Sequence, residues 1–332
     1  MLIAIRADGS QDIGLGHLYR SSVVAADLMN RGHDVTILTR TPSYAGHVAA
    51  EGVIIKSLPA ENERSTVTDW IKSNDVKAIV TDLYEIDIGY QRQLGETGSA
   101  VIVVLDDTPS RIRADVVVNP NVYAPKLEYN WEGDEPNWCL GSKYILLREP
   151  FSTFASKYRP FPRNVDNIVV TMGGVDRENR SPVVLRALDR FDLHTTVIIG
   201  PGFNTSEEIR ATAAQCSRPV TILEDPEDLP QYFVQADLAI CTLGTTAYEL
   251  LATRTPIIGI PDNETPMPEA LDELDAAIVL AHTPTVGDVS AGVSRVLEDT
   301  ELRRQLWRVG GQVVTGGGAS NVVNAIEAST DP

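Results

Sequence analysis

Cysteine is scarce in this chain, with three residues in 332, and no two of them lie at the spacing of a metal site or a redox pair. Cys139, Cys216 and Cys241 therefore indicate isolated thiols, which favours a reducing, cytoplasmic location over a secreted one. Long apolar runs are also missing, and the N-terminus lacks the basic and then apolar pattern of a signal peptide. We therefore expect no membrane insertion.

Basic residues are few, because 28 Lys and Arg face 46 Asp and Glu and leave a net charge of -18. A protein that binds nucleic acid needs a basic stripe to neutralise phosphates, so we expect no nucleic-acid partner. The acids are spread along the chain, which favours a solvated acidic surface of the kind suited to a salt-rich cytoplasm. A phosphate-bearing ligand would need backbone N–H groups and a few arginines to hold it.

Several cofactor motifs are absent as well. The glycine turn Gly14-Leu15-Gly16 has no third glycine at dinucleotide spacing, and no acid ends the apolar run 34–39, which argues against a nicotinamide enzyme. The chain has no P-loop, no nucleophile elbow and no zinc-ligand spacing. We expect neither a cofactor nor a metal.

What the chain does have is a regular alternation of strand-length apolar runs and helix-length segments. The runs are rich in Val and Ile and almost continuously apolar, as are strands buried on both faces of a parallel sheet. The alternation predicts doubly wound α/β structure. The expected strands are 2–6, 34–39, 78–81, 101–105 and 115–118, then 168–172, 195–199, 220–223, 238–241 and 256–260, and the clearest helices are 21–31, 88–95, 181–191 and 245–253.

This pattern of a strand followed by a glycine turn begins twice. The first run leads into Gly14 and Gly16, and the run that starts near residue 167 leads into Gly173-Gly174. Residues 150–166 lie between the two patterns, contain three prolines and show little periodicity, which indicates a linker. We predict a first domain at 1–150, a second domain at 165–310 and a C-terminal helical segment at 311–332.

His17 directly follows the first glycine turn, where a strand end meets a helix. Parallel sheets bind their ligands beyond the carboxyl ends of the strands, and the N-terminus of a helix favours an anion. A histidine titrates near neutral pH and can serve there as a general base. A helix-capping or core histidine is the alternative interpretation.

A second candidate site follows the expected strand 238–241, where Gly244, Thr245 and Thr246 open a helix. Either threonine can cap this helix, and its free N–H groups could hold a diphosphate. Glu249 shares a helix face with both threonines, so its carboxylate could accept two hydrogen bonds from a ribose diol. A capping box of Thr246 with Glu249 explains the same spacing equally well.

Carboxylates also follow two expected strands in the first half of the chain. Asp82 precedes Tyr84 after one strand, and Asp106 and Asp107 follow the next. Acid pairs can bind magnesium, cap helices or accept hydrogen bonds from sugar hydroxyls. No histidine or further carboxylate lies nearby in the sequence, so a metal site is the least favoured of the three.

Taken in order, these motifs resemble the UDP-sugar hydrolases of pseudaminic acid biosynthesis, which act on UDP-2,4-diacetamido-2,4,6-trideoxy-β-L-altropyranose, and the related spore-coat polysaccharide proteins. The resemblance covers most of the chain. It departs from the family after Asp262-Asn263, where Glu264 replaces the usual glutamine and a proline-rich stretch follows. The matching segments are Arg6-Ala7-Asp8 with Ile13-Gly14-Leu15-Gly16-His17 and Arg20; Asp82-Leu83-Tyr84 with Asp87; Leu105-Asp106-Asp107 with Asp115 and Asn119-Pro120-Asn121; Leu140-Gly141-Ser142-Lys143-Tyr144-Ile145-Leu146-Leu147-Arg148; Gly173-Gly174-Val175-Asp176; Gly244-Thr245-Thr246 with Glu249 and Asp262-Asn263; and Gly316-Gly317-Gly318-Ala319.

The resemblance implies a GT-B-like fold, in which two Rossmann-like doubly wound domains face each other across a cleft that holds the active site. It implies metal-independent, inverting hydrolysis at the anomeric carbon, with release of UDP and the free sugar. His17 would be the general base with Tyr84 as its catalytic neighbour, while Glu249 holds the ribose and Thr245 and Thr246 contact the diphosphate. The further substrate-binding residues that it implies are Arg6, Asp8, Gly14, Gly16, Arg20, Asp107, Gly173, Gly174, Gly244 and Asn263.

Two other functions stay open at this point. A glycosyltransferase of the same fold would use an acceptor hydroxyl where the hydrolase uses water. A non-catalytic nucleotide-sugar binding protein would need no base, and the position of His17 argues against it. The loops after the strands of the first domain are rich in Asp, Asn and Tyr, which suits a polar sugar. A UDP-sugar is the partner that the resemblance implies. The oligomeric state stays open.

Overall fold

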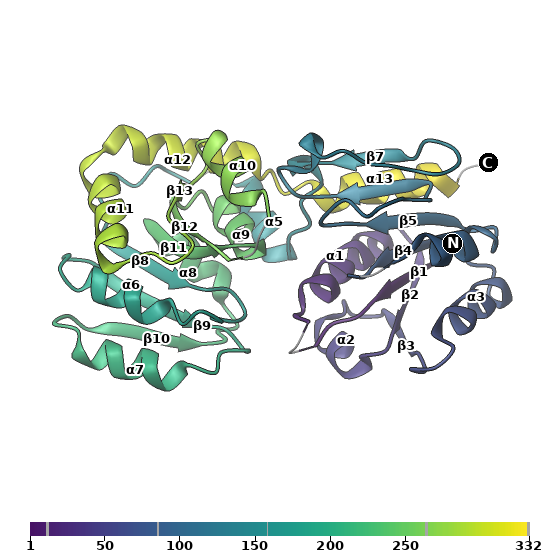
Figure 1. The fold of residues 1–332 in the computed structure, drawn as a ribbon, viewed down its shortest axis with the longest axis horizontal. Helices are drawn as coiled ribbons and strands as arrows, with labels where there is room; N and C mark the ends of the chain where they lie inside the picture. Colours follow the sequence, from purple (N-terminus) through teal and green to yellow (C-terminus); the bar gives the residue numbers. More distant parts are fainter. Residues whose placement is uncertain (11–12, 85, 158, 263–264, 331–332) are drawn as a thin grey trace. The chain divides into compact units, whose positions relative to one another are not determined.

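The computed structural model describes residues 1–10, 13–84, 86–157, 159–262 and 265–330. The chain forms two compact units, which we call unit 1 (Met1–Glu149 with Gly317–Pro332) and unit 2 (Pro150–Gly316). Figure 1 shows that each unit is a sheet covered by helices on both faces. None of the described helices is both long enough and apolar enough to cross a membrane.

Unit 1 contains a sheet of seven parallel strands in the order β3-β2-β1-β4-β5-β6-β7. The strand order reverses between β1 and β4, and open α/β sheets bind ligands beyond the carboxyl ends of the strands at such a point. The strands are β1 (Leu2–Ala7), β2 (Asp34–Thr39), β3 (Ile54–Ser57), β4 (Ala78–Asp82), β5 (Ala100–Val104), β6 (Val116–Asn119) and β7 (Asn137–Leu140). The helices are α1 (Gly16–Asn30), α2 (Pro42–Val48), α3 (Glu63–Ser73), α4 (Ile88–Gly95) and α13 (Gly318–Thr330), with short 3-10 turns η1 (Ala124–Lys126) and η2 (Ser142–Tyr144).

Strand β1 is apolar apart from Arg6, because helices cover both faces of its sheet. Ile3 and Ile5 are fully buried in a core shared with residues of α1 and α13. Ala4, which points to the other face, lies in a second core with residues of α3 and α4. The uninterrupted hydrophobicity of residues 2–5 is therefore typical of a strand with no face toward solvent.

The C-terminal helix α13 is part of unit 1, although it is separated in sequence from the rest of that unit. Val322 and Ile326 are buried in the same core as Ile3 and Ile5. Arg31, the C-cap residue of α1, donates hydrogen bonds to Asn324 at 2.6 Å and to Glu327 at 2.7 Å. The helix in the segment 311–332 therefore packs on the N-terminal sheet.

Unit 2 repeats the same plan with six parallel strands in the order β10-β9-β8-β11-β12-β13. Its strand order reverses between β8 and β11. The strands are β8 (Asn167–Thr171), β9 (His194–Ile199), β10 (Val220–Glu224), β11 (Leu238–Leu243), β12 (Ile257–Pro261) and β13 (Ile278–Val279). The helices are α5 (Glu149–Ser156), α6 (Ser181–Leu188), α7 (Ser206–Gln215), α8 (Leu229–Gln235), α9 (Thr245–Ala252), α10 (Met267–Glu273), α11 (Val286–Glu298) and α12 (Thr300–Val313).

The predicted doubly wound α/β class is confirmed, and every expected strand forms to within two residues at each end. The strands that sequence reasoning missed are β3, β7 and β13, which lie at the edges of the sheets. An edge strand is covered less completely, as the 62% exposure of Ile54 in β3 illustrates, so its sequence is less uniformly apolar. The expected linker 150–166 also contains most of helix α5. The interdomain cleft implied by the resemblance stays a prediction.

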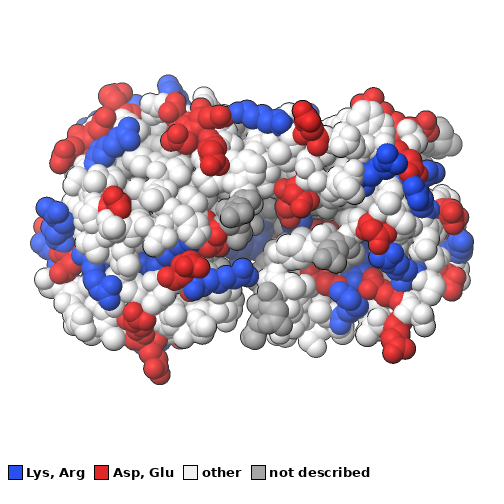
Figure 2. Space-filling model, viewed as in Figure 1, with Lys and Arg blue, Asp and Glu red and all other residues white. Residues whose placement is uncertain are grey.

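Charged side chains are spread over the face drawn in Figure 2 rather than collected in one region of it. On the face drawn in Figure 2, Asp and Glu lie on both units and are interspersed with Lys and Arg. This agrees with the even spread of acids along the sequence.

We predict that Gly318→Ala lowers the free energy of unfolding by about 1–3 kcal/mol. A Cβ atom at Gly318 would lie 1.9 Å from the carbonyl oxygen of Ile145, which belongs to the backbone and cannot rotate away. Gly317→Ala is the matched control, because its Cβ would approach only the Asn321 side chain, at 3.9 Å. Urea denaturation measures both variants, and equal stability of the two would contradict this close packing of α13.

Candidate functional site

The loop from β1 to α1 brings His17 to the carboxyl end of the unit 1 sheet. Gly14 has a φ of 82°, a conformation that favours glycine, and its carbonyl accepts a hydrogen bond from the Ser10 N–H at 3.1 Å. Helix α1 begins two residues later with Leu15 as its N-cap and without a side-chain cap. His17 is therefore not the capping residue, and it is only 5% exposed.

His17 is paired with Asp82, the last residue of β4. Strand β4 lies beside β1 with Asp82 opposite Ala7, so the loop that follows β1 returns over this carboxylate. The Nδ1 atom of His17 lies 2.6 Å from Oδ1 of Asp82, whose side chain is 1% exposed. Burial would raise the pKa of Asp82, but the charge of Arg20 and hydrogen bonds from Arg20 and His17 hold it below its ordinary value.

An ionised Asp82 can only accept a hydrogen bond, so its partner Nδ1 must carry a proton. We therefore assign the proton of the neutral imidazole to Nδ1. The lone pair is then on Nε2, which makes no hydrogen bond to the part of the chain that the structure describes. A histidine held in this tautomer by a buried carboxylate is arranged to accept a proton at Nε2. The role of His17 as a general base stays a prediction.

Arg20 lies one turn further along α1 and joins two carboxylates. Its Nε donates to Oδ2 of Asp82 at 2.6 Å, and its Nη1 donates to Oδ1 of Asp106 at 2.7 Å. Burial would lower the pKa of Arg20, but Asp82 and Asp106 raise it well above its ordinary value. Asp106 follows β5, the neighbour of β4, so the cluster joins the ends of adjacent strands.

The structure brings Asp106 into this cluster, whereas the resemblance pointed to its neighbour Asp107. Asp106 also accepts a hydrogen bond from the Asn121 amide at 3.1 Å, and its backbone carbonyl accepts one from the Tyr123 hydroxyl at 2.9 Å. Asp107 is exposed. Adjacent residues in a loop point in different directions, and the sequence does not show which acid turns toward α1.

Tyr84 lies beside His17, as the resemblance implied. The two ring centroids are 4.2 Å apart with an interplanar angle of 77°, which is an edge-to-face contact. The Tyr84 hydroxyl donates to the carbonyl of Ile13 at 3.1 Å and so links this loop to the glycine turn. The side chain is 69% exposed, which leaves most of its ring open to a ligand.

Arg6 and Asp8 belong to a separate buried network at the ends of β1 and β2. The Nη2 atom of Arg6 donates to Asp8 at 2.6 Å, and its Nε donates to Glu63 at 2.7 Å. Asp8 accepts further hydrogen bonds from the Thr39 hydroxyl and from Arg40. Burial would raise the pKa of Asp8, but the hydrogen bond and charge of Arg6, together with Arg40, lower it to about 2.

In unit 2, a group of glycines lies at the end of β8. Gly173 has a φ of 72°, and the amide N–H of Gly202 donates to the carbonyl of Gly174 at 2.9 Å. A Cβ at Gly200 would lie 2.3 Å from the carbonyl oxygen of Gly173, so only glycine fits there. A Cβ at Gly173 would lie 3.5 Å from Oγ1 of Thr246, which shows that this loop adjoins the start of α9.

Helix α9 begins earlier than the capping interpretation requires. Gly244, in an extended conformation, is its N-cap, and no side chain caps the helix. The expectation that Thr245 or Thr246 caps α9 is therefore wrong, and so is the capping box, because Thr246 lies inside the first turn. Glu249 is buried, with 5% exposure. Asn263 lies outside the described residues.

Sequence reasoning missed a cluster in unit 2 around Arg180. The Asp176 carboxylate accepts the backbone N–H groups of Arg180 and Ser181, at 2.8 and 2.9 Å. The Arg180 guanidinium donates to Asp262 at 2.7 Å and lies 3.2 Å from Nε2 of His282. These partners are 82 and 102 residues from Arg180 in the sequence, so no local pattern indicates them.

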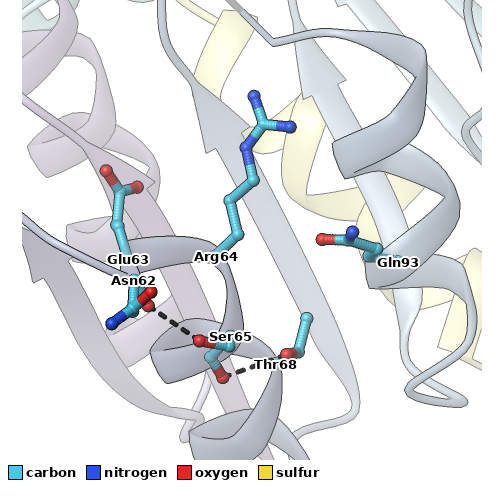
Figure 3. Close-up of a pocket in the computed structure, with 6 residues that line it drawn as sticks. All are labelled: Asn62, Glu63, Arg64, Ser65, Thr68 and Gln93. Carbon is cyan, nitrogen blue, oxygen red and sulfur yellow. Dashed lines mark hydrogen bonds between the residues drawn. The ribbon is translucent and has the colours of Figure 1, made fainter.

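An open depression of about 550 Å³ also lies over the start of α3 in unit 1, as Figure 3 shows. The hydrogen bonds drawn there, from Ser65 to Asn62 and from Thr68 to Ser65, belong to the first turns of the helix. Glu63 on its wall is already paired with Arg6. The depression shares no residue with the His17 cluster, and we assign it no ligand. It is lined by Asn62, Glu63, Arg64, Ser65, Thr68 and Gln93.

Within the described residues, no group of three or more His, Cys, Asp or Glu side chains is arranged to hold a metal ion. Independence from metals stays a prediction.

Comparison with solved structures defines the class of fold. The chain superposes on MurG of Acinetobacter baumannii with a TM-score of 0.69 and 16% identity, over 98% of this chain and 99% of that one. It superposes on the calicheamicin glycosyltransferase CalG4 with a TM-score of 0.67 and 14% identity, over 98% of each chain. For a UDP-GlcNAc 2-epimerase from Neisseria meningitidis, solved with UDP-GlcNAc bound, the TM-score is 0.64 at 10% identity, over 99% and 100% of the chains. These likenesses confirm the predicted GT-B-like fold.

Sequence comparison gives more particular relatives, although no protein-family model matches the chain. The chain is 26% identical to an uncharacterised protein of Methanocaldococcus jannaschii, over 80% of this chain and 56% of that protein. It is 23% identical to the spore coat polysaccharide biosynthesis protein SpsG of Bacillus subtilis, over 98% of both. It is 26% identical to the UDP-2,4-diacetamido-2,4,6-trideoxy-beta-L-altropyranose hydrolase of Campylobacter jejuni, over 54% of this chain and 63% of that protein. The match thus spans less than two thirds of the first and third relatives.

We predict that Asp8→Asn lowers the free energy of unfolding at pH 7 by about 2–4 kcal/mol, because it leaves the buried Arg6 without the charge of one partner. The folded-state pKa of Asp8 is about 2, below the value of about 4 in an unfolded chain. The stabilisation is therefore complete above about pH 4 and is lost as the pH falls toward about 2.

Urea denaturation at a series of pH values should show the gap between wild type and Asp8→Asn narrowing below about pH 4. Asp75→Asn is the control, because Asp75 is 84% exposed and should leave stability nearly unchanged. If the difference in free energy of unfolding between wild type and Asp8→Asn did not change with pH, Asp8 would not be a buried, ionised partner of Arg6.

Proposed function

We propose that this chain is an enzyme that hydrolyses a UDP-linked sugar at its anomeric carbon. The observation that carries the proposal is the buried pair of His17 and Asp82 beside the switch point of the unit 1 sheet. The similarity to a UDP-sugar hydrolase of Campylobacter jejuni supports this reaction. A structural neighbour solved with UDP-GlcNAc supports a nucleotide sugar as the ligand.

In this proposal His17 is the general base. Asp82 accepts a hydrogen bond from the Nδ1–H of His17, so Nε2 can take a proton from a water molecule. The water oxygen forms a bond to the anomeric carbon while the bond to UDP breaks, and UDP leaves with the electron pair. Because water attacks from the side opposite UDP, the anomeric configuration inverts.

Orientation and charge are the main requirements, because UDP is already a good leaving group. A correctly placed base typically contributes about 10²–10⁴-fold to such a step. Tyr84 packs edge-to-face against the imidazole and restricts its rotation, while its exposed ring offers an apolar surface to the sugar.

Unit 2 supplies the nucleotide site in this proposal. The N-terminus of α9 has no side-chain cap, and the positive end of a helix dipole suits a diphosphate. The adjoining glycines Gly173 and Gly174 allow backbone groups to approach closely. Glu249, buried in the same helix, suits the two hydroxyls of a ribose.

We propose a diacetamido-trideoxy sugar, consumed in nonulosonic acid or surface-glycan biosynthesis, as the sugar part of the substrate. The full-length similarity to SpsG supports a role in surface-polysaccharide biosynthesis. The polar side chains after β4, β5 and β6, such as the exposed Asp107, offer hydrogen bonds to hydroxyl and acetamido groups.

An inverting glycosyltransferase is the second candidate, because the structural neighbours include the glycosyltransferase CalG4. An acceptor hydroxyl would then take the place of water at Nε2 of His17. The chemistry at the base and at the nucleotide is the same in both candidates, so only the nucleophile separates them.

Incubation with a panel of UDP-sugars in the absence of an acceptor tests the proposal. We expect release of UDP, with ¹⁸O from labelled water at the anomeric carbon and an inverted anomer in NMR spectra recorded before mutarotation. Label in the phosphate would exclude attack at the anomeric carbon. An absolute requirement for a sugar or lipid acceptor would assign the chain as a transferase.

We predict that His17→Ala lowers turnover by about 10²-fold or more and leaves UDP affinity nearly unchanged, because it removes the base but not the nucleotide site. Steady-state kinetics and calorimetry with UDP measure the two effects. His47→Ala is the matched control, since His47 is an exposed histidine on α2. Full activity of His17→Ala would reduce His17 to a structural residue.

A further inference from the structure

We infer that Arg20 and Asp106 are positioning residues that set the protonation of His17 through Asp82, an inference that rests on the proposed function. The resemblance pointed to Arg20 as a substrate-binding residue. The contacts of its guanidinium point to a different role.

All three nitrogens of the Arg20 guanidinium are engaged inside the cluster. Nε and Nη2 hold the two oxygens of Asp82, each at 2.6 Å, and Nη1 and Nη2 hold the two oxygens of Asp106, at 2.7 and 2.9 Å. A planar fork that spans two carboxylates fixes the orientation of both. It turns Oδ1 of Asp82 toward His17 and leaves the guanidinium little capacity to bind a phosphate.

Arg20 also approaches the imidazole itself. Its Nη2 lies 2.8 Å from Nδ1 of His17. Both groups are donors when Nδ1–H donates its hydrogen bond to Asp82, so this contact is a cation held beside the ring and not a hydrogen bond. A positive charge at this distance disfavours the imidazolium, whereas the charge of Asp82 favours it.

Four side chains from three parts of the fold face His17. They are Arg20 from α1, Asp82 and Tyr84 at the end of β4, and Asp106 after β5, which reaches the imidazole through Arg20. With a neutral imidazole, the two carboxylates and the guanidinium leave one net negative charge. Removing either Arg20 or Asp106 changes this charge, and the two removals change it in opposite directions.

Arg20→Gln leaves two negative charges beside the ring and should favour the imidazolium. The titration midpoint of His17 should rise by roughly one unit or more, and the acidic limb of the kcat/KM profile should move to higher pH. Arg20→Lys keeps the charge but not the planar fork, so its midpoint should stay much closer to that of the wild type.

Asp106→Asn keeps the shape of the side chain and an oxygen for Arg20 but removes the negative charge. The midpoint of His17 should therefore fall, by about half a unit because Asp106 is partly exposed and its field is screened. In the double variant, Arg20→Gln with Asp106→Asn, one net negative charge is restored. Its midpoint should return toward the wild-type value.

NMR titration of the histidine side chains reads these midpoints without any substrate. His17→Gln identifies the His17 signal among the five histidines. Arg92→Gln and Asp75→Asn are controls that make the same charge changes at exposed pairs elsewhere in unit 1, and they should leave the His17 midpoint unchanged. Because the readout needs no turnover, a failure of the proposed hydrolase activity is distinguished from a failure of this inference.

Opposite shifts in the two single variants, with recovery in the double variant, would support the inference. Shifts in the same direction, or no shift, would overturn it, because a merely structural role predicts no dependence on the sign of the charge removed. If Arg20→Gln does not fold, Asp106→Asn and Arg20→Lys still decide the question. An unchanged or raised midpoint in Asp106→Asn would then overturn it. A weaker affinity for UDP in Arg20→Lys at an unchanged midpoint would restore Arg20 as a phosphate ligand.

Discussion

The buried charge of Asp82 is the constraint on which the arrangement of the unit 1 site depends. A carboxylate that is 1% exposed is costly to bury unless opposite charge and hydrogen bonds compensate it. The compensation comes from one helix, because His17, Arg20 and Ser21 of α1 all reach this carboxylate. The start of α1 is thereby held against the end of β4, and the glycine turn before the helix is held with it.

The parallel sheet explains why these groups meet. Strand β4 pairs with β1 on one side and with β5 on the other, so the loops after all three strands leave the sheet at the same edge. Unit 2 has the same central order, with β8 beside β11, and there Gly173 adjoins Thr246. One topological rule therefore places both candidate sites. They differ in side chains, since unit 1 presents ionised groups and unit 2 presents glycine and threonine around a helix N-terminus.

Much of this arrangement could be predicted from the sequence, and the limits have physical causes. Strands buried on both faces carry a continuous apolar signal, whereas β3, β7 and β13 lie at sheet edges and lack it. His17 was identifiable from its glycine turn, but its partner Asp82 is 65 residues away and no local spacing reveals the pair. The start of α9 at residue 245 was predicted, but its N-cap was assigned to a threonine, whereas Gly244 takes that position.

Arginine is the residue that makes a buried site possible in so acidic a chain. Arg6, Arg20 and Arg180 are each largely buried, and each donates to a carboxylate at 2.6–2.7 Å. A guanidinium stays charged on burial and can bridge two acceptors in one plane, whereas a lysine readily loses its proton when desolvated. Salt screens the repulsion among exposed acids, but it acts weakly on partners in direct contact inside the protein. The net charge of -18 is therefore a property of the exposed side chains. The alignment of His17 depends instead on a few buried ion pairs, whose strength is largely independent of the net charge.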